Sequence, residues 1–420
     1  MLRRRKHDKI MHMFKRKKST QNTEVAAGSR NAEFSFLSEN DLYFDSACQS
    51  LRPTSVVKAM QKYYEEYNSC GERVRYKWGL KVDAEVTEIR EKTLKFLGFS
   101  AKEFFTAFTL NTTYGLNLAL SQLDGSKFSR IITSDVEHNS VFLTSMEFAK
   151  KWNIPREILS REEDGSLPDF DAKNALVVVN AVSNIDARKL ENLREVAKKV
   201  RENGGFLVID AAQTLGFYSE WFREQLKGIG ADVVCFSAHK MYGPSLGAIV
   251  ARKNIVEKLN VAFLGGGMVD DVREDSYDLS AKTNPDEHIH TIFEPGLQLY
   301  AEIIGFGAAL DFINSRKKAD YDEIERVSKK ILDFLGSKKS VHVINHKTSS
   351  TISFYSDKMD AHLLAEALSS AGVMTRSGYY CAHYYLDHVK HYPPLVRLSL
   401  SFANTESDAD KLIEILTKAL

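Results

Sequence analysis

Short apolar runs alternate with amphipathic segments through the middle of this chain. Strands are predicted at 104–110, 129–133, 176–180, 206–210 and 233–236, with helices between them at 114–123, 140–152 and 190–203. Strands that alternate with helices indicate an α/β fold, in which a mostly parallel central sheet has helices on both faces. A further strand is expected at 247–251, on the edge of that sheet. The polar stretch 271–290 is expected to be a solvated loop, although its histidines His288 and His290 are possible metal ligands.

The pattern changes after residue 300. Helical patterns at 301–317, 321–335 and 361–371 are interspersed with strand patterns at 341–345, 351–355 and 396–402. Thr405, with Asp408 three residues later, is typical of a capping box that starts a last helix. We therefore expect a small C-terminal α+β domain at 315–420. A large domain at 33–314 precedes it, and the N-terminal segment of the large domain is a candidate to pack on the small one.

Composition and charge exclude several classes of protein. The 420 residues are 43% hydrophobic and 27% charged, as in a soluble globular protein. Their net charge of +1 gives no overall electrostatic field that would attract nucleic acid or a membrane. No apolar run is long enough to cross a bilayer. The four cysteines are far apart and include no CxxC pair, which argues against a disulfide framework and against zinc. We expect a cytoplasmic protein without metal, nucleic acid or membrane partners.

The basic residues are concentrated at the N-terminus. Residues 1–18 hold most of the positive excess and lead into a polar stretch at 19–30. Such a segment has little apolar surface to bury, so 1–32 is predicted to be a disordered tail. A targeting role or contact with an anionic surface remains an alternative.

Two strand ends carry candidate catalytic groups. The apolar run 233–236 leads through Ser237 and His239 to Lys240, at the end of a strand where open α/β sheets bind ligands. A lysine there suits a Schiff base with pyridoxal phosphate, and a surface lysine is the plain alternative. Asp210 ends the strand 206–210. Its carboxylate needs a partner such as the protonated pyridine nitrogen of that cofactor, unless it merely caps a helix.

Polar residues follow the other strands as well. Thr112 and Thr113 open a helix, where free N–H groups and hydroxyls bind anions or simply cap the helix. His138 suits stacking on an aromatic cofactor, proton transfer or a structural role. Asn184 and Gln213 offer amides to a ring hydroxyl or to a backbone group.

The small domain contributes a second set of candidates. Cys381 follows Arg376 in a Gly- and Tyr-rich stretch and is a nucleophile if its thiolate is stabilised, or else a buried cysteine. Arg397 lies in an apolar strand, which favours a bidentate carboxylate partner, either a substrate or an internal acid.

Together these segments resemble the class V aminotransferase-like, fold type I enzymes that use pyridoxal phosphate, and among them the group II cysteine desulfurases. The likeness runs from about Tyr43 to the C-terminus. The motifs that carry it, in order, are Tyr43-Phe-Asp-Ser-Ala47, Thr112-Thr113, Glu137-His138-Asn139, Val182-Ser-Asn184, Asp210-Ala-Ala-Gln213, Ser237 to Lys240, Gly265-Gly-Gly-Met268, Phe293-Glu-Pro-Gly296 and Arg376 to Ala382. Each is weak alone, and their order over most of the chain is a strong signal.

The resemblance implies a role for each candidate. Lys240, His138 and Cys381 are the implied catalytic residues, and Arg397, Arg376 and Asn184 the implied substrate-binding ones. The implied residues for pyridoxal phosphate are Thr112, Thr113, His138, Asn184, Asp210, Gln213, Ser237, His239 and Lys240. The family also implies a homodimer.

The implied reaction converts L-cysteine to L-alanine. Cys381 takes the sulfur as a persulfide and passes it to a sulfur-acceptor protein, a step of sulfur metabolism such as iron–sulfur cluster assembly. Alternatives are another class V reaction (transaminase, selenocysteine or other C–S lyase, epimerase) with Cys381 incidental, or a non-catalytic scaffold. Leu297 and the pair Tyr379-Tyr380 depart from the family pattern, in which a Thr or Ser and two histidines are usual.

Overall fold

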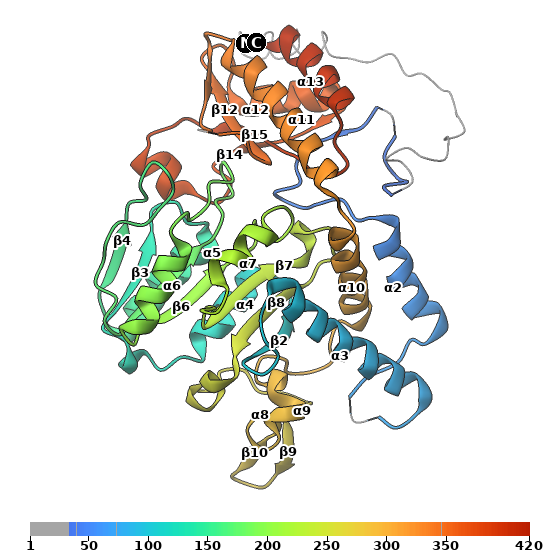
Figure 1. The fold of residues 1–420 in the computed structure, drawn as a ribbon, viewed down its shortest axis with the longest axis vertical. Helices are drawn as coiled ribbons and strands as arrows, with labels where there is room; N and C mark the ends of the chain where they lie inside the picture. The colour runs from blue at the N-terminus through green and yellow to red at the C-terminus, as the bar shows by residue number, and fades with distance from the viewer. Residues whose placement is uncertain (1–32, 39, 73, 346) are drawn as a thin grey trace, which may run out of the picture. The chain divides into compact units, whose positions relative to one another are not determined.

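The structure is a computed structural model that describes residues 33–420 except 39, 73 and 346 (Figure 1). The predicted tail at 1–32 lies outside the described residues. Two compact units make up the chain. The large unit consists of Ser55–Val182 and Lys189–Asn314, and the small unit consists of the residues up to Thr54, Ser183–Arg188 and Ser315–Leu420. The predicted domain boundaries stay a prediction.

A seven-stranded sheet is the centre of the large unit, within its described residues, with the strand order β2-β8-β7-β6-β5-β3-β4. The strands are β2 Phe104–Thr109, β3 Arg130–Ser134, β4 Arg156–Leu159, β5 Ala175–Asn180, β6 Phe206–Asp210, β7 Val233–Ser237 and β8 Gly247–Arg252. Neighbours from β4 to β7 pair in parallel, and β8 pairs antiparallel with both β7 and β2. The prediction of a mostly parallel sheet is confirmed.

The position of β8 corrects the expectation of an edge strand. It lies between β7 and β2, and all of its residues are buried, because its apolar run is covered by helices on both faces. The edges are instead β2 and β4. The sequence did not predict β4, since four residues with two charged side chains carry no apolar periodicity.

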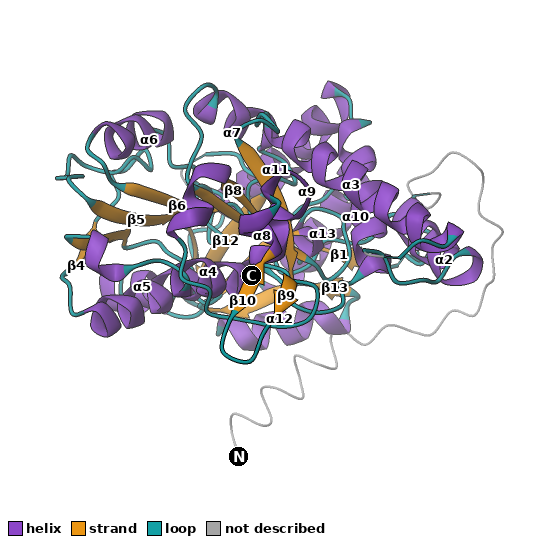
Figure 2. Ribbon diagram, turned by 90° about the horizontal axis from the view of Figure 1, so that it is seen from below, coloured by secondary structure: helices purple, strands orange, loops and turns teal. Residues whose placement is uncertain are grey.

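Helices cover both faces of this sheet. Figure 2 shows the strands between α6 and α7 on one side and α4 and α5 on the other. The longer helices of the large unit are α2 Thr54–Glu66 (whose first residue ends the small unit's N-terminal segment), α3 Lys77–Leu97, α4 Thr112–Ser121, α5 Asn139–Trp152, α6 Leu193–Glu202, α7 Ser219–Leu226 and α10 Tyr300–Asn314. The predicted helices at 114–123, 140–152 and 190–203 correspond to α4, α5 and α6, which pack on strands of the sheet, and the prediction at 301–317 corresponds to α10, which packs on α3.

Residues 269–292 are more regular than the expected solvated loop. They form a hairpin and short helices, namely β9 Val269–Val272, β10 Tyr277–Leu279, α8 Ser280–Thr283, α9 Pro285–His288 and the 3₁₀ turn η5 Ile289–Ile292. Ser280, Ala281 and Ile292 are buried, so this segment contributes to the core of the large unit. Among the described residues, no helix combines the length and apolar character needed to cross a bilayer.

The small unit has its own antiparallel sheet of order β11-β12-β15-β14. Its strands are β11 Val341–Val343, β12 Thr351–Ser356, β14 Arg376–Gly378 and β15 Leu395–Ser399, and a separate parallel pair is formed by β1 Leu42–Tyr43 and β13 Val373–Met374. Its helices are α11 Lys318–Gly336, α12 Ala361–Ser370, the π-helical turn η6 Tyr384–Val389 and α13 Glu406–Ala419.

The segment Ser183–Arg188 is bonded into the small unit, although the chain on either side of it belongs to the large one. Ser353 of β12 donates its hydroxyl to the carbonyl of Ile185 at 2.6 Å, and Asn345 donates its amide to the carbonyl of Asp186 at 3.2 Å. These bonds fix the position of Asn184 within the small unit.

The capping box at the start of α13 gives a stability prediction. Thr405 accepts a hydrogen bond from the backbone N–H of Asp408, and the Asp408 carboxylate accepts one from the N–H of Thr405 at 2.9 Å. Thr405→Ala should lower the free energy of unfolding by about 1 kcal/mol, since it removes the hydroxyl that accepts the N–H of Asp408 at the start of the helix. Urea denaturation measures this, and Thr405→Ser, which keeps the hydroxyl, should stay close to wild type. Equal losses in both variants would contradict the capping role.

Candidate active site

Three strands of the large unit end at the same edge of the sheet. Asn180 of β5 is opposite Asp210 of β6, and Asp210 is opposite Cys235 of β7. Lys240 closes a short 3₁₀ turn, Ala238–Lys240, directly after β7. The parallel register therefore brings the predicted carboxylate and the predicted lysine to neighbouring strand ends, where ligands of α/β proteins bind.

Asp210 carries a buried carboxylate at this edge. Its carboxylate accepts hydrogen bonds from the hydroxyl of Ser140 at 3.2 Å and from the backbone N–H of Ala212 at 2.9 Å. Burial raises the pKa of Asp210 above its ordinary value, and the charge of Lys240 opposes that rise. A cationic group bound beside this carboxylate would relieve the cost of its burial.

His138 is connected to Asp210 through Ser140. The Nδ1 atom of His138 lies 2.8 Å from the hydroxyl of Ser140. It also accepts a hydrogen bond from the backbone N–H of Ser140 at 3.0 Å, and this bond caps α5. Sequence reasoning missed Ser140, and the only signal was its place at the start of a helix, two residues after the histidine. The result is a half-buried imidazole with a fixed orientation.

Thr112 and Ser237 form a hydroxyl pair at the N-terminus of α4. The Ser237 hydroxyl accepts the backbone N–H of Thr112 at 2.9 Å and lies 2.6 Å from its hydroxyl. Gly247 permits this approach, because a Cβ there would lie 2.5 Å from the Cα of Asn111. A helix N-terminus with two hydroxyls suits an anion such as phosphate. Thr113 is exposed on the next position of the helix.

His239 and Gln213 are half-buried and follow β7 and β6. They occupy the same strand ends as Lys240 and Asp210, so the sequence-predicted cofactor residues of the large unit gather at one edge of its sheet.

A buried ion pair supports the segment before His138. The guanidinium of Arg161 lies 3.1 Å from Glu137 and donates to the carbonyl of Asn180 at 2.7 Å, while the N–H of Asn180 donates to Glu137 at 2.7 Å. Both side chains are almost fully enclosed, and burial raises the pKa of Glu137 despite the cation beside it. This network ties the ends of β3 and β5 together and was not predicted from the sequence.

A second polar cluster lies away from these strand ends. Ligand atoms of Glu72, His290 and Glu294 all lie within 4.8 Å of one another. The two carboxylate oxygens of Glu294 accept hydrogen bonds from the two terminal nitrogens of Arg90, at 2.5 and 2.6 Å. The Nε2 atom of His290 lies 3.2 Å from Oε1 of Glu72. Because a guanidinium already occupies the buried carboxylate, the cluster is an ion-pair network, and the expectation of no bound metal stays a prediction.

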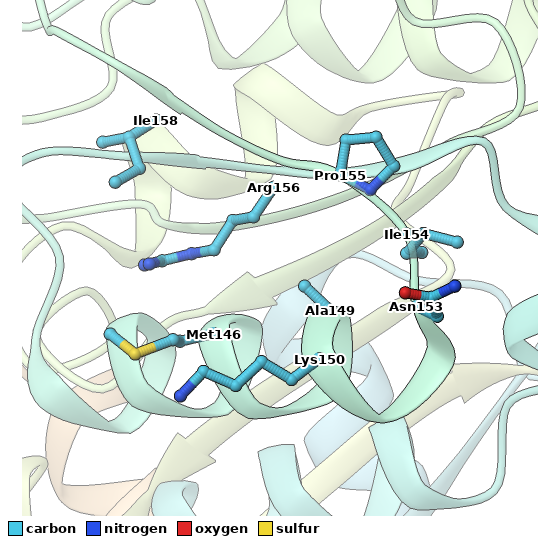
Figure 3. A pocket seen from close by; sticks show the side chains of 8 residues that line it. All are labelled: Met146, Ala149, Lys150, Asn153, Ile154, Pro155, Arg156 and Ile158. Atoms are coloured by element: carbon cyan, nitrogen blue, oxygen red, sulfur yellow. The ribbon is translucent and has the colours of Figure 1, made fainter.

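A pocket on the large unit is also separate from the candidate residues. Figure 3 shows it between the end of α5 and β4, and its lining residues are Met146, Ala149, Lys150, Asn153, Ile154, Pro155, Arg156 and Ile158. None of them is a predicted site residue.

The small unit brings together Arg397, Asn184 and Tyr380. The Nη1 atom of Arg397 donates to the carbonyl of Asn184 at 3.0 Å, and the amide of Asn184 donates to the carbonyl of Tyr380 at 2.7 Å. The guanidinium carbon lies 4.8 Å from the centre of the Tyr380 ring. Arg376 is opposite Arg397 on the adjacent strand β14 and is exposed. Two arginines on neighbouring strands suit a ligand with a carboxylate.

Cys381 follows Tyr380 with its side chain exposed, so the alternative of a buried cysteine is wrong. Both residues have φ in the left-handed region, 50° for Tyr380 and 59° for Cys381. Side chains disfavour this conformation, and its use at two consecutive positions is typical of functional loops. The thiol is therefore held at the surface by a strained turn that starts from the strand carrying Arg376.

The large-unit residues suit a ligand with a phosphate, a cationic ring and a carbonyl group, and the small-unit residues suit a carboxylate and a reactive sulfur. A family model described as aminotransferase class-V matches residues 42–412. The chain belongs to the class-V aminotransferase family. This membership confirms the resemblance to class V aminotransferase-like enzymes that the motifs indicated.

Similar class-V proteins include several cysteine desulfurases. A probable cysteine desulfurase of Methanothermobacter thermautotrophicus is 28% identical over 90% of this chain and 95% of its own length, and a cysteine desulfurase of Haloferax volcanii is 26% identical over 90% and 89%. The structure of an apo cysteine desulfurase from Thermococcus onnurineus superimposes with a TM-score of 0.82 at 26% identity, over 95% of this chain and 99% of that one. The predicted fold class is confirmed.

The buried Asp210 gives a pH prediction. Because its folded-state pKa is raised, the folded protein without cofactor binds more protons than the unfolded chain above the ordinary value of 3.8. The free energy of unfolding should therefore fall as pH rises from about 4 through the raised pKa, by at most about 1.4 kcal/mol per pH unit for this group. Asp210→Asn should make that fall shallower.

Urea denaturation of cofactor-free protein at about pH 5 and about pH 8 measures this difference. Asp275→Asn, which removes an exposed carboxylate, is the control and should keep the wild-type slope. An unchanged slope in Asp210→Asn would show that Asp210 is not the buried charge that matters.

Proposed function

We propose that this class-V protein is a cysteine desulfurase that uses pyridoxal phosphate and converts L-cysteine to L-alanine. The observation that carries the proposal is the turn after β14. There an exposed thiol, Cys381, follows the tyrosine that stacks on the buried arginine, Arg397. Relatives that align with nine tenths of this chain are named cysteine desulfurases, which supports the same reaction.

The residues at the strand ends fit pyridoxal phosphate. The donor set of Thr112, Ser237 and the α4 N-terminus suits its phosphate, and the raised pKa of Asp210 marks a carboxylate that a cationic ring nitrogen would satisfy. When bound, this cofactor supplies an electron sink that stabilises negative charge at the substrate Cα. We assign Thr113 and His239 to the phosphate as well, and Gln213 and Asn184 to hydrogen bonds with polar groups of the cofactor.

Residues of both units then act on the cofactor and the substrate. The amine of Lys240 binds the cofactor and moves protons as general acid and base, and His138 supports the ring with its imidazole plane. Arg397 binds the α-carboxylate of the substrate, with Arg376 and Asn184 beside it. These roles stay proposals that the variants below test.

Cys381 receives the sulfur. Its thiolate attacks the sulfur of the substrate, so a sulfur–sulfur bond forms while the carbon–sulfur bond breaks. The electron pair of the broken bond stays with the carbon fragment, which takes up a proton and leaves as L-alanine. Cys381 is left as a persulfide, and no external oxidant is required. The exposed position of the thiol suits delivery of that sulfur to the thiol of an acceptor protein.

We also propose a reducing, cytoplasmic location and a role in sulfur metabolism. All four cysteines are free, including exposed Cys70 and Cys381, which supports a compartment where thiols persist. Iron–sulfur cluster assembly is one use of the transferred sulfur that fits this chemistry.

A homodimer completes the proposal. Two loops of the large unit lie side by side, because the N–H of Gly296 donates to the carbonyl of Gly266 at 2.8 Å. These loops and their flanks expose four large apolar side chains: Phe263, Leu264, Leu297 and Leu299. Leu297 is 74% exposed, where the family usually has a Thr or Ser. An apolar patch of this kind is typical of a protein interface, and a second copy is the occupant that the family resemblance implies.

The reaction is tested with purified, cofactor-loaded protein and L-cysteine in the presence of a reductant. Wild type should release L-alanine and sulfide in equal amounts. Cys381→Ala should lose at least about a hundredfold in rate while keeping the visible absorbance of the bound cofactor. Cys70→Ala, which removes another exposed thiol, should keep the wild-type rate. Lys240→Ala should lose both the cofactor absorbance and the activity.

The outcomes separate the candidate reactions. A loaded wild-type protein that leaves L-cysteine untouched contradicts the desulfurase proposal. Full turnover by Cys381→Ala would instead assign a C–S lyase in which that thiol is incidental.

The dimer is tested by light scattering of the purified protein. Leu297→Asp should weaken the dimer by at least about tenfold, since it buries a charge in an apolar interface. Leu297→Thr, which restores the usual residue type of the family, should leave the mass of the wild type unchanged. A monomeric wild type would exclude the homodimer, and an intact Leu297→Asp dimer would exclude this patch.

A further inference from the structure

Arg397 is buried and contacts three residues of its own unit. Its side chain is 3% exposed, Nη1 donates to the carbonyl of Asn184, and the Tyr380 ring covers its plane. Nη2 forms an ion pair with Asp45 at 3.3 Å. Nε is buried and has no hydrogen-bond partner among the described residues. One edge of the guanidinium therefore has an unused donor at Nε and a donor at Nη2 that Asp45 already holds.

The backbone holds Asp45 at this position. Asp45 forms a β-bridge with Ser399 of β15, two residues beyond Arg397. The N–H of Ser399 donates to the carbonyl of Phe44 at 2.7 Å, and the N–H of Ser46 donates back to the carbonyl of Ser399 at 3.3 Å. These bonds place the Asp45 carboxylate beside Arg397 whether or not the ion pair forms.

Arg397 in turn keeps its orientation without Asp45. The carbonyl of Asn184 and the ring of Tyr380 are neutral contacts that fix the guanidinium plane, and β15 is hydrogen-bonded on both sides, to β12 and β14. Asp45 therefore contributes mainly its negative charge. That charge is 19% exposed on its side chain and also lies 3.9 Å from Arg376.

A second carboxylate would meet Asp45 at this edge. Bidentate binding to a guanidinium uses two parallel N–H donors, and the edge formed by Nε and Nη2 is where a donor remains unused. A carboxylate arriving there shares Nη2 with Asp45, and two carboxylates at hydrogen-bonding distance of one nitrogen repel each other.

We propose that Asp45 is an internal competitor that weakens the binding of the substrate α-carboxylate to Arg397 and so sets substrate affinity. The inference rests on the proposed function, in which Arg397 binds that carboxylate. It makes Asp45 a specificity-determining residue that favours release of the amino-acid product, since the fixed carboxylate of Asp45 repels the carboxylate that shares Nη2 with it.

The test compares two ligands that differ only at the carboxylate. L-alanine and L-alaninamide are titrated into cofactor-loaded protein, followed by visible absorbance and by calorimetry, so that no turnover is needed. Asp45→Asn keeps the size of the side chain and removes its charge. It should bind L-alanine about fivefold more tightly, the scale of one partly exposed charge pair, and bind L-alaninamide as wild type does.

Asp45→Glu is the matched control, because it keeps a carboxylate beside Arg397 and should bind L-alanine no more tightly than wild type. Asp45→Ser repeats the comparison if the asparagine variant does not fold, and urea denaturation reports the folding of each variant. Unchanged or weaker binding of L-alanine by the charge-removing variants, or an equal gain for both ligands, would overturn the proposal.

A further variant separates this inference from the function on which it rests. Arg397→Gln should weaken the binding of L-alanine and leave the binding of L-alaninamide unchanged. If it changes neither, Arg397 does not bind the carboxylate, and the assignment of Arg397 fails together with the role of Asp45. If Arg397→Gln weakens the binding of L-alanine while Asp45→Asn binds it as wild type does, only the competition by Asp45 is overturned.

Discussion

The parallel pairing of β5, β6 and β7 is the constraint on which the large unit depends. It ends three buried strands at one edge, and on the middle strand it leaves a carboxylate, Asp210, inside the protein. A buried charge is costly, so its surroundings are polar and ordered, from the Ser140 hydroxyl to the Glu137–Arg161 pair that ties the neighbouring strand ends. The same cost makes the edge suited to a cationic ligand.

Much of this edge could be predicted from the sequence. Apolar runs that end abruptly in charged residues identify buried strands and their carboxyl ends, which is why Lys240 and Asp210 were found together with β6 and β7. The position of β8 could not be predicted in this way, because strand order depends on pairings between distant segments rather than on local pattern. The hairpin β9–β10 was not predicted, for a related reason. Its exposed strands alternate little, and its pairing rests on backbone bonds that composition does not reveal.

The small unit shows a sharper limit. Motif order located Cys381, Arg376 and Arg397, but the ion pair between Arg397 and Asp45 joins residues 352 positions apart. An isolated strand-borne arginine indicates only that some carboxylate is near. The β-bridge between Asp45 and Ser399, a tertiary contact without a local signature, is what brings an internal acid to this arginine. The sequence likewise gives no sign that Asn184 belongs to the small unit, since the chain on either side of 183–188 belongs to the large unit.

The small unit is built from both ends of the described chain, and this has a consequence for biosynthesis. Strand β1 pairs with β13, and Asp45 is anchored to β15, so the segment at 33–54 emerges from the ribosome long before its partners exist. The strands of the seven-stranded sheet are all made by residue 252, whereas β1 and Asp45 must wait for partners far along the chain, and contacts of such long sequence separation form slowly. The small unit, which carries Arg397, is therefore the last part of the protein to mature, and a chain that stops short of β15 lacks that arginine altogether.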